Sequence, residues 1–284
     1  GDFCFHGCQS LKQISIPSSV TSIGMFAFSI FIDMKYKSSE SLLSETSNTK
    51  SQPSIIPKLV QITFENPPSI EEIGCHTFSG CSSLKQILIP SSVTLIDNFA
   101  FCTCKKLEKI TFEYPSSVSS IGLHAFTNCK SLTYISIPSS VVSIDECAFS
   151  ECKSLNQITF EYPSSVSSIG SYAFARCKSL TYISIPSSVS SIGSCAFAIC
   201  ESLAHISIPS SVTKIEEYLF YKCSSLEQIT ISSSVTSIGS NAFSGCSSLK
   251  QITFENPSSL TSIGSQAFDK CESLTQITIP SSVS

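Results

Sequence analysis

Apolar residues recur along this chain in a fixed order that repeats about every two dozen positions. The segment from Cys129 reads CKSLTYISIPSSVVSIDECAFSE, and the segment from Cys177 reads CKSLTYISIPSSVSSIGSCAFAI. Their common unit is C-x-x-L-x-x-I-x-I-P-S-S-V-x-x-I-G-x-x-A-F-x-x, and from Cys81 onward its Cys recurs after 23 or 25 residues. One such unit is too short to bury its own apolar side chains, whereas stacked copies cover one another. The pattern therefore predicts a repeat solenoid.

The I-x-I step inside each unit has the period of a β-strand, with the skipped residue pointing outward. Copies of one strand at one register form a parallel sheet, which we expect on the concave face of a curved coil. The x-x-A-F-x-x-C stretch is too short for a long helix, so turns with short 3₁₀ or α pieces are expected on the convex face. Eleven strands are predicted to begin near Gln13, Gln61, Gln86, Lys109, Tyr134, Gln157, Tyr182, His205, Gln228, Gln251 and Gln276.

Glycine follows the isolated Ile in most units. The positions are Gly24, Gly74, Gly122, Gly170, Gly193, Gly239 and Gly264. Because glycine adopts a positive φ without a steric penalty, we expect these residues to form turns that require one.

The whole chain, 1–284, is predicted to form a single domain of about 11–12 units of 23 or 25 residues. Residues 32–55 break the pattern, because the repeat would place Lys37 and Glu45 at core positions, where burial is costly. We interpret this segment as an extruded loop or a degenerate repeat, and a loop that contacts a partner is a further alternative. Both ends stop inside a unit, so we expect either a fragment of a longer protein or ends that associate with another chain.

Composition narrows the classes of partner. Charged residues make up 13% of the chain, the net charge is −4 and the pI is about 5.6. These values argue against nucleic-acid binding and against a basic membrane-binding face. No apolar run reaches the ~18 residues of a membrane span, so we expect no membrane insertion by this segment.

Fifteen Cys residues need an explanation in a chain of this length. The repeat positions are Cys8, Cys81, Cys104, Cys129, Cys152, Cys177, Cys200, Cys223, Cys246 and Cys271. Because a free Cys behaves as a small apolar residue, they are predicted to form a ladder of unpaired buried thiols beside a column of Phe. The other five are the more reactive thiols if they are exposed, namely Cys4, Cys75, Cys102, Cys147 and Cys195.

The sequence carries no motif for catalysis or for a cofactor. It has no Gly-rich phosphate loop, no H-E-x-x-H and no G-x-S-x-G. His6, His76 and His124 occupy variable positions flanking the repeat Phe, which places them on the convex face. Cys75, His76 and Cys81 match no zinc-ligand spacing. We therefore predict a protein that is not an enzyme, with no catalytic residue, no cofactor and no metal site.

The outward positions of the strands form a column of Gln and Tyr beside a column of Ser and Thr. These residues either form a solvated sheet surface without a binding role or contact a partner. The second alternative is suggested by the tyrosines, because aromatic side chains on a rigid face are favoured anchors for proteins. Our candidate partner-binding residues on the sheet are Tyr134, Tyr182, His205, Lys109 and Gln157. The long turns beside them add Glu113, Tyr114, Glu161 and Tyr162.

The pattern L-x-x-I-x-I-P-x-S-V-x-x-I-G-x-x-A-F-x-x-C resembles the BspA-type (Treponema-type) leucine-rich repeat over nearly the whole chain. It departs from common leucine-rich repeats by lacking the Asn of their turn ladder. The resemblance implies a right-handed leucine-rich-repeat coil. It also implies a surface antigen-like protein of the kind found in bacteria and protozoan parasites, where such proteins are implicated in adhesion.

On that resemblance we expect a non-catalytic protein-binding module at the cell surface or outside the cell, contacting host or neighbouring proteins through its concave face. A cytoplasmic scaffold is the alternative, and unpaired thiols in a chain without an N-x-[S/T] sequon favour it. A third alternative is a structural array that self-associates end to end. The identity of the partner stays open.

Overall fold

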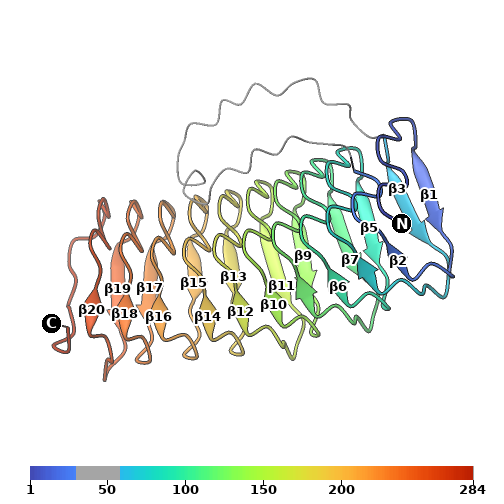
Figure 1. Cartoon of the computed structure of the whole chain (residues 1–284). Helices are drawn as coiled ribbons and strands as arrows, with labels where there is room; N and C mark the ends of the chain where they lie inside the picture. The colour runs from blue at the N-terminus through green and yellow to red at the C-terminus, as the bar shows by residue number, and fades with distance from the viewer. Residues whose placement is uncertain (30–57, 284) are drawn as a thin grey trace.

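The chain folds into a row of parallel-stranded coils, described by a computed structural model over residues 1–29 and 58–283 (Figure 1). Each regular coil contributes one longer strand and one strand of two residues. The segment 32–55, interpreted above as a loop or degenerate repeat, lies outside the described residues.

The longer strands begin at ten of the eleven predicted residues. They are β1 (Gln13–Ile16), β3 (Gln61–Phe64), β5 (Gln86–Ile89), β7 (Lys109–Phe112), β9 (Tyr134–Ile137), β11 (Gln157–Phe160), β13 (Tyr182–Ser184), β15 (His205–Ser207), β17 (Gln228–Ile231) and β19 (Gln251–Phe254). We call the surface formed by their outward side chains the strand face.

The longer strands pair in parallel and in register, which confirms the prediction of a parallel solenoid. Strands β5 to β15 form one six-stranded sheet, while β1–β3 and β17–β19 form separate pairs. In β9 and β11, Tyr134 lies beside Gln157 and Ile135 beside Ile158. Equivalent positions of successive units therefore form straight columns, apolar inside and polar outside.

A second set of strands was not predicted, because each covers only the isolated Ile and the residue before it. They are β2 (Ser22–Ile23), β4 (Glu72–Ile73), β6 (Leu95–Ile96), β8 (Ser120–Ile121), β10 (Ser143–Ile144), β12 (Ser168–Ile169), β14 (Ser191–Ile192), β16 (Lys214–Ile215), β18 (Ser237–Ile238) and β20 (Ser262–Ile263). Strands β2 to β14 form a seven-stranded sheet, and β16, β18 and β20 form another.

The prediction of helical pieces after the isolated Ile was wrong for the residues that the structure describes, which form turns there. The reason lies in how the backbone N–H groups are used. Ala125 N donates to Gly122 O within its own turn, whereas Phe126 N donates to Ala148 O of the next coil. Since successive N–H groups alternate between the turn and the neighbouring coil, a continuous helical ladder cannot form. We call this surface the turn face.

The expectation of a positive φ at the glycines after the isolated Ile was also wrong. Among the described glycines, those with a positive φ are Gly7, Gly80 and Gly245, each directly before a repeat Cys. At Gly193, a Cβ atom would lie 2.4 Å from the backbone N of Ser171 in the preceding coil. These glycines are needed for the close approach of neighbouring coils.

The positive φ values fall instead on side-chain-bearing residues of the turn face. One such column stands two positions before the repeat Phe: Phe3, Phe26, His76, Phe99, His124, Cys147, Tyr172, Cys195, Tyr218, Asn241 and Gln266. We call it the outer turn column. Each left-handed residue is held in a turn whose hydrogen bonds reach both its own coil and the next, so that the stack imposes the conformation.

The core contains a continuous stack of Phe rings, as predicted. Phe174 is fully buried, and its ring centroid lies 5.6 Å from that of Phe149 and 5.5 Å from that of Phe197. Eight of the ten repeat Cys residues pack beside this stack as buried free thiols, whereas Cys271 is partly buried and Cys8, in the first coil, is exposed, so the prediction of a buried ladder was wrong at Cys8. Each buried one also donates a weak hydrogen bond to a Phe carbonyl one coil back, as Cys200 Sγ does to Phe174 O at 3.2 Å.

The eleventh predicted strand, at Gln276, is absent, since residues 274–280 are described but join no sheet. The last coil is tied to the preceding one at two points, where Ser273 N donates to Ser247 O and Ser282 Oγ donates to Leu260 O. Between these points Ile277 is only partly buried, so that it contributes less packing energy than its buried counterparts.

Candidate functional site

The structure brings the five sheet candidates together in one row across the strand face. The paired strands β7 to β15 place them in the order Lys109, Tyr134, Gln157, Tyr182, His205. All five side chains are exposed, and the two tyrosines keep 42% and 53% of their surface accessible. The parallel in-register pairing is what aligns them, because each is the first residue of its strand.

The Tyr134 side chain is tied to the neighbouring strand, because its hydroxyl lies 2.9 Å from Thr159 Oγ1 on β11. Tyr182 is its equivalent two coils further on. Ser207 takes the place of Thr159 there, and the ring is the more exposed of the two. The row therefore presents one anchored ring and one freer ring.

The four candidates of the long turns occupy two equivalent positions. Tyr114 and Tyr162 project into solvent with exposed fractions of 89% and 97%, and each precedes a proline. The two glutamates lie at the start of these turns, directly after β7 and β11.

The glutamates carry out a structural task in these turns. Glu113 Oε2 accepts the backbone N–H of Ser91 at 2.9 Å, and Glu161 Oε2 accepts that of Ser139 at 3.1 Å. Glu255 does the same with Ser233 at 3.0 Å. A charge-assisted bond to a backbone donor fixes the turn against the preceding coil, and thereby fixes the base from which each tyrosine projects.

An aromatic stack on the turn face was missed by the sequence analysis. In the outer turn column, the rings of Phe3, Phe26, His76, Phe99 and His124 stack in order with centroid separations of 4.5–5.1 Å. The sequence carries a usable signal for this stack, because the residue two positions before the repeat Phe is Phe or His in each of these units.

Both imidazoles of this stack are held in the neutral form. Burial, together with a smaller effect of the neighbouring His76, lowers the pKa of His124 to about 4. Burial also lowers the pKa of His76, against the opposing effect of Asp97. Protonation would place a positive charge between aromatic rings in a partly desolvated column.

We therefore expect stability to fall as the pH drops from about 6.5 towards 4. Over this range the unfolded chain binds a proton at His124 that the folded chain does not, so folding is disfavoured. After allowance for the partly exposed ring, we expect a loss of about 2 kcal/mol. Urea unfolding at pH 7 and pH 4.5 measures this loss. The His124→Phe variant, which copies the residue at Phe99, should show a flatter pH profile. An unchanged profile would contradict the assignment.

The additional cysteines differ in exposure. Cys4 is exposed and Cys75 is partly buried, whereas Cys102, Cys147 and Cys195 are buried. Cys147 and Cys195 pack with Tyr172 and Ile199 in a small second apolar cluster. Burial raises the pKa of Cys147 to about 12 and that of Cys195 to about 11, so neither is a reactive thiolate at neutral pH.

Thiol titration should therefore divide the fifteen cysteines into three groups. We expect Cys4 and Cys8 to react quickly with a disulfide reagent in the folded protein, and the partly buried Cys75 and Cys271 to react slowly. The eleven buried thiols should react only after unfolding in guanidinium. A Cys4→Ser/Cys8→Ser variant is the control and should lose the fast phase. Reaction of more than four thiols in the folded state would contradict the ladder of buried thiols.

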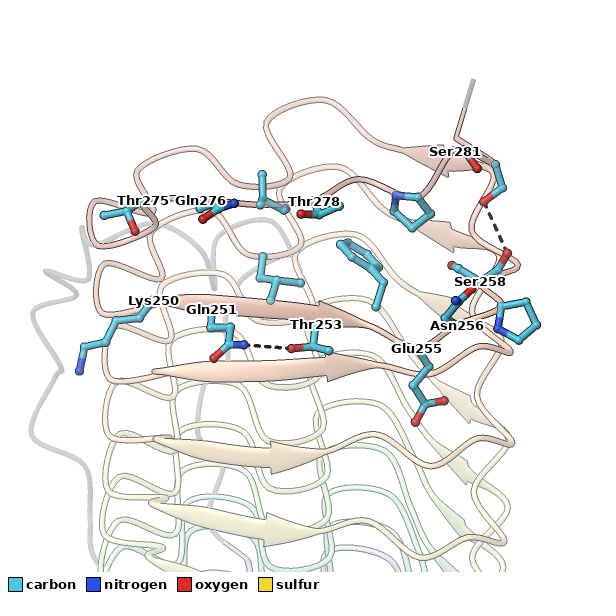
Figure 2. A pocket seen from close by; sticks show the side chains of 16 residues that line it. Lys250, Gln251, Thr253, Glu255, Asn256, Ser258, Thr275, Gln276, Thr278 and Ser281 are labelled. Atoms are coloured by element: carbon cyan, nitrogen blue, oxygen red, sulfur yellow. Dashed lines mark hydrogen bonds between the residues drawn. The ribbon is translucent and has the colours of Figure 1, made fainter.

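The structure also contains a groove that none of the predicted residues lines. It has a volume of about 760 Å³ and separates β19 from the extended residues 275–278 of the last coil (Figure 2). Its outward rim carries amides and hydroxyls, including Gln251, whose Nε2 donates to Thr253 Oγ1 at 3.4 Å. The groove offers hydrogen-bonding side chains and no nucleophile paired with a base.

Neither a metal centre nor a membrane span is found in the described part of the chain. Within residues 1–29 and 58–283, no group of three or more His, Cys, Asp and Glu side chains is arranged to hold a metal ion. The same residues form no helix with the length and hydropathy needed to cross a bilayer.

Comparison with known proteins links this repeat to a family. The model of the BspA type leucine rich repeat region matches in six copies, over residues 1–49, 56–181 and 167–284. A search of curated proteins returned no match.

Several solved structures are similar to this chain. A leucine-rich repeat protein from Bacteroides ovatus is 28% identical with a TM-score of 0.53, covering 96% of this chain and 80% of that one. The pneumococcal vaccine antigen PcpA is 22% identical with a TM-score of 0.53, covering 96% and 73%. A leucine rich cell surface protein from Faecalibacterium prausnitzii is 28% identical with a TM-score of 0.47, covering 93% and 78%.

Proposed function

The chain belongs to the BspA-type leucine-rich repeat family, and from this membership we propose that it is a non-catalytic adhesion module that binds other proteins at a cell surface. The repeat family indicates a protein-interaction module and is typically non-catalytic. The observation that carries the proposal is the set of exposed tyrosines, Tyr114, Tyr134, Tyr162 and Tyr182, on backbone held by neighbouring coils. Exposed aromatic rings on rigid supports are preferred anchors in protein interfaces.

The proposed contact surface joins the strand face to the long turns. Tyr134, Gln157, Tyr182 and His205, flanked by Lys109, would supply the sheet contacts. Tyr114 and Tyr162 would supply contacts from the turns, where Glu113 and Glu161 position them. Because these side chains stand on a preformed backbone, binding would order few residues, which lowers its entropic cost.

Tyr182→Ala is expected to weaken binding to a protein partner at least tenfold while leaving folding intact. Loss of an aromatic anchor typically costs at least about 1.4 kcal/mol, which is tenfold in affinity. An exposed side chain contributes little to stability, so the free energy of unfolding should change by less than about 0.5 kcal/mol. Partners retained by the immobilised wild-type chain and lost by the variant would be identified, purified and measured by surface plasmon resonance.

Gln61→Ala is the matched control, because Gln61 is the first residue of β3, in the same outward column but away from the tyrosines. It should bind as the wild type does. A purified partner whose affinity is unchanged by replacing all four exposed tyrosines would contradict the proposed surface.

Location at the cell surface is the second element of the proposal. It is supported by membership of the BspA-type repeat family, whose relatives include surface proteins. The fifteen free thiols favour the alternative, a scaffold in a reducing compartment. Labelling of intact cells with a membrane-impermeant biotin reagent separates the two, since only a surface protein is labelled before lysis.

A further inference from the structure

The centre of the strand face combines two aromatic rings with uncharged hydrogen-bonding side chains, a composition that protein binding alone does not require. The outward positions of β9, β11, β13 and β15 are Tyr134, Ser136, Gln157, Thr159, Tyr182, Ser184, His205 and Ser207. They comprise two tyrosines, one amide, one imidazole and four small hydroxyls. None carries a permanent charge, and none is a large aliphatic side chain. The only broad apolar surfaces in this region are therefore the faces of the two tyrosine rings.

The two tyrosines are attached to the sheet at a fixed backbone separation along the solenoid axis. Tyr134 pairs with Gln157, and Gln157 pairs with Tyr182, so one strand lies between them (Figure 1). Two strand spacings place their Cα atoms about 10 Å apart. Gln157 lies between them and can donate and accept hydrogen bonds. The row continues with His205, so that rings and polar groups alternate.

From this arrangement we propose that the strand face binds a neutral, β-1,4-linked polysaccharide that runs along the solenoid axis, with alternate sugar rings stacked on Tyr134 and Tyr182. In an extended chain of this linkage every second pyranose presents the same face, and this repeat matches the separation of the two tyrosines. The C–H face of a pyranose is apolar and its edges carry hydroxyls.

Each part of such a ligand meets a matching group on the protein. The sugar faces stack on the rings, and the sugar that lies between them offers its hydroxyls to the Gln157 amide. The hydroxyls of Ser136, Thr159, Ser184 and Ser207 form a parallel column along one side of the chain. An uncharged ligand also avoids the desolvation of ionic groups over these four strands, whose outward side chains include no permanent charge to pair with them.

The way in which the two tyrosines are held on the sheet favours the polysaccharide site. The Tyr134 hydroxyl is bonded to Thr159 Oγ1 at 2.9 Å, which restricts the ring before any ligand arrives. Both tyrosines stand on strands of the six-stranded sheet, whose register fixes the distance between their Cα atoms. A platform that is rigid in the free protein loses little entropy on binding, and this matters for a ligand that makes only shallow contacts.

Titration of the whole chain with cellohexaose and chitohexaose, followed by calorimetry, tests the proposal. We expect saturable binding of at least one hexaose. Cellobiose, which is too short to reach both rings, should bind at least tenfold more weakly than cellohexaose. Maltohexaose, whose α-linkage curves the chain, should also bind at least tenfold more weakly. The chain has no Trp, so the fluorescence of its eight tyrosines, two of which form the platform, provides a second signal.

Variants at the two tyrosines separate stacking of the sugar on the rings from other causes of hexaose binding. Tyr134→Ala and Tyr182→Ala should each weaken hexaose binding at least tenfold, whereas Gln61→Ala on β3 should change it less than twofold. Tyr134→Phe keeps the ring and should lose less than threefold. If Tyr134→Phe loses as much as Tyr134→Ala, the hydroxyl and not the ring is what matters, and the stacking assignment is overturned.

The inference shares residues with the proposed protein contact, but the two can fail separately. Absence of saturable binding for both hexaoses, or equal binding by the wild type and Tyr182→Ala, overturns the polysaccharide site. If a purified protein partner still depends on Tyr182 in that case, the protein-binding proposal stands alone. If the hexaoses bind as expected while no purified protein depends on the tyrosines, the polysaccharide site stands and the protein contact fails.

Discussion

Replacing Phe174 by alanine is expected to lower the free energy of unfolding by about 3–5 kcal/mol, the range found for other buried Phe residues. Phe174 is fully buried, and its ring stacks between those of Phe149 and Phe197. Truncation removes the apolar area of the ring and leaves a cavity inside a stack that runs through the solenoid. Because the coils on both sides are held by backbone hydrogen bonds, they cannot collapse to fill it.

Urea unfolding of the wild type and Phe174→Ala, followed by far-ultraviolet circular dichroism, measures this loss. Repeat arrays can unfold in more than one step, so the slope of the transition must be compared between variants before free energies are derived. Tyr162→Ala is the control for loss of an aromatic ring from an exposed site, and it should change stability by less than about 0.5 kcal/mol. A loss below about 1 kcal/mol for Phe174→Ala would show that the ring stack contributes little to the core.

The alternation of apolar and polar residues was sufficient to predict the longer strands. Each I-x-I step places two side chains inward and one outward, and the identical units leave one register that buries every Ile. Tyr134, Gln157 and Tyr182 could be placed in one row for the same reason, since they hold equivalent positions in successive units. Exposure of the ring of Tyr182 followed from its position in the unit.

What the pattern could not predict depends on contacts between coils. The bond from Ser91 N to Glu113 joins two units, and only the neighbouring coil shows that the Glu113 carboxylate has a backbone partner. The turn at His124 likewise resembles a short helix when one unit is read alone, but its successive N–H groups donate alternately to the same turn and to the next coil. Gln276 carries the same local pattern as Gln251, yet its segment joins no sheet because the pairing is not encoded locally.

Gly193→Ala is expected to destabilise the protein by about 3 kcal/mol. The reason is a steric clash of the added Cβ, and not the positive φ that usually explains a glycine in a turn. Gly193 does not require a positive φ, so alanine would meet no conformational penalty there. Its Cβ would instead lie 2.4 Å from Ser171 N and 2.8 Å from Gly170 C, which are backbone atoms of the preceding coil. Backbone atoms in a ladder cannot rotate away, so the two coils must separate.

That separation would stretch the bond from Gly193 N to Ile169 O, now 2.8 Å, and loosen the pairing of β12 with β14. Within the described residues, the same column contains the Cβ-bearing residues Asp97, Asp145 and Glu216, whose coils accommodate a side chain, whereas the 2.4 Å approach at Gly193 leaves no room for one. Ser194→Ala is the control, because it changes the adjacent residue without adding an atom near the preceding coil. Thermal and urea unfolding of both variants measure the effect. If Gly193→Ala were as stable as Ser194→Ala, the coils would have room for a side chain, and close approach would not explain the glycine.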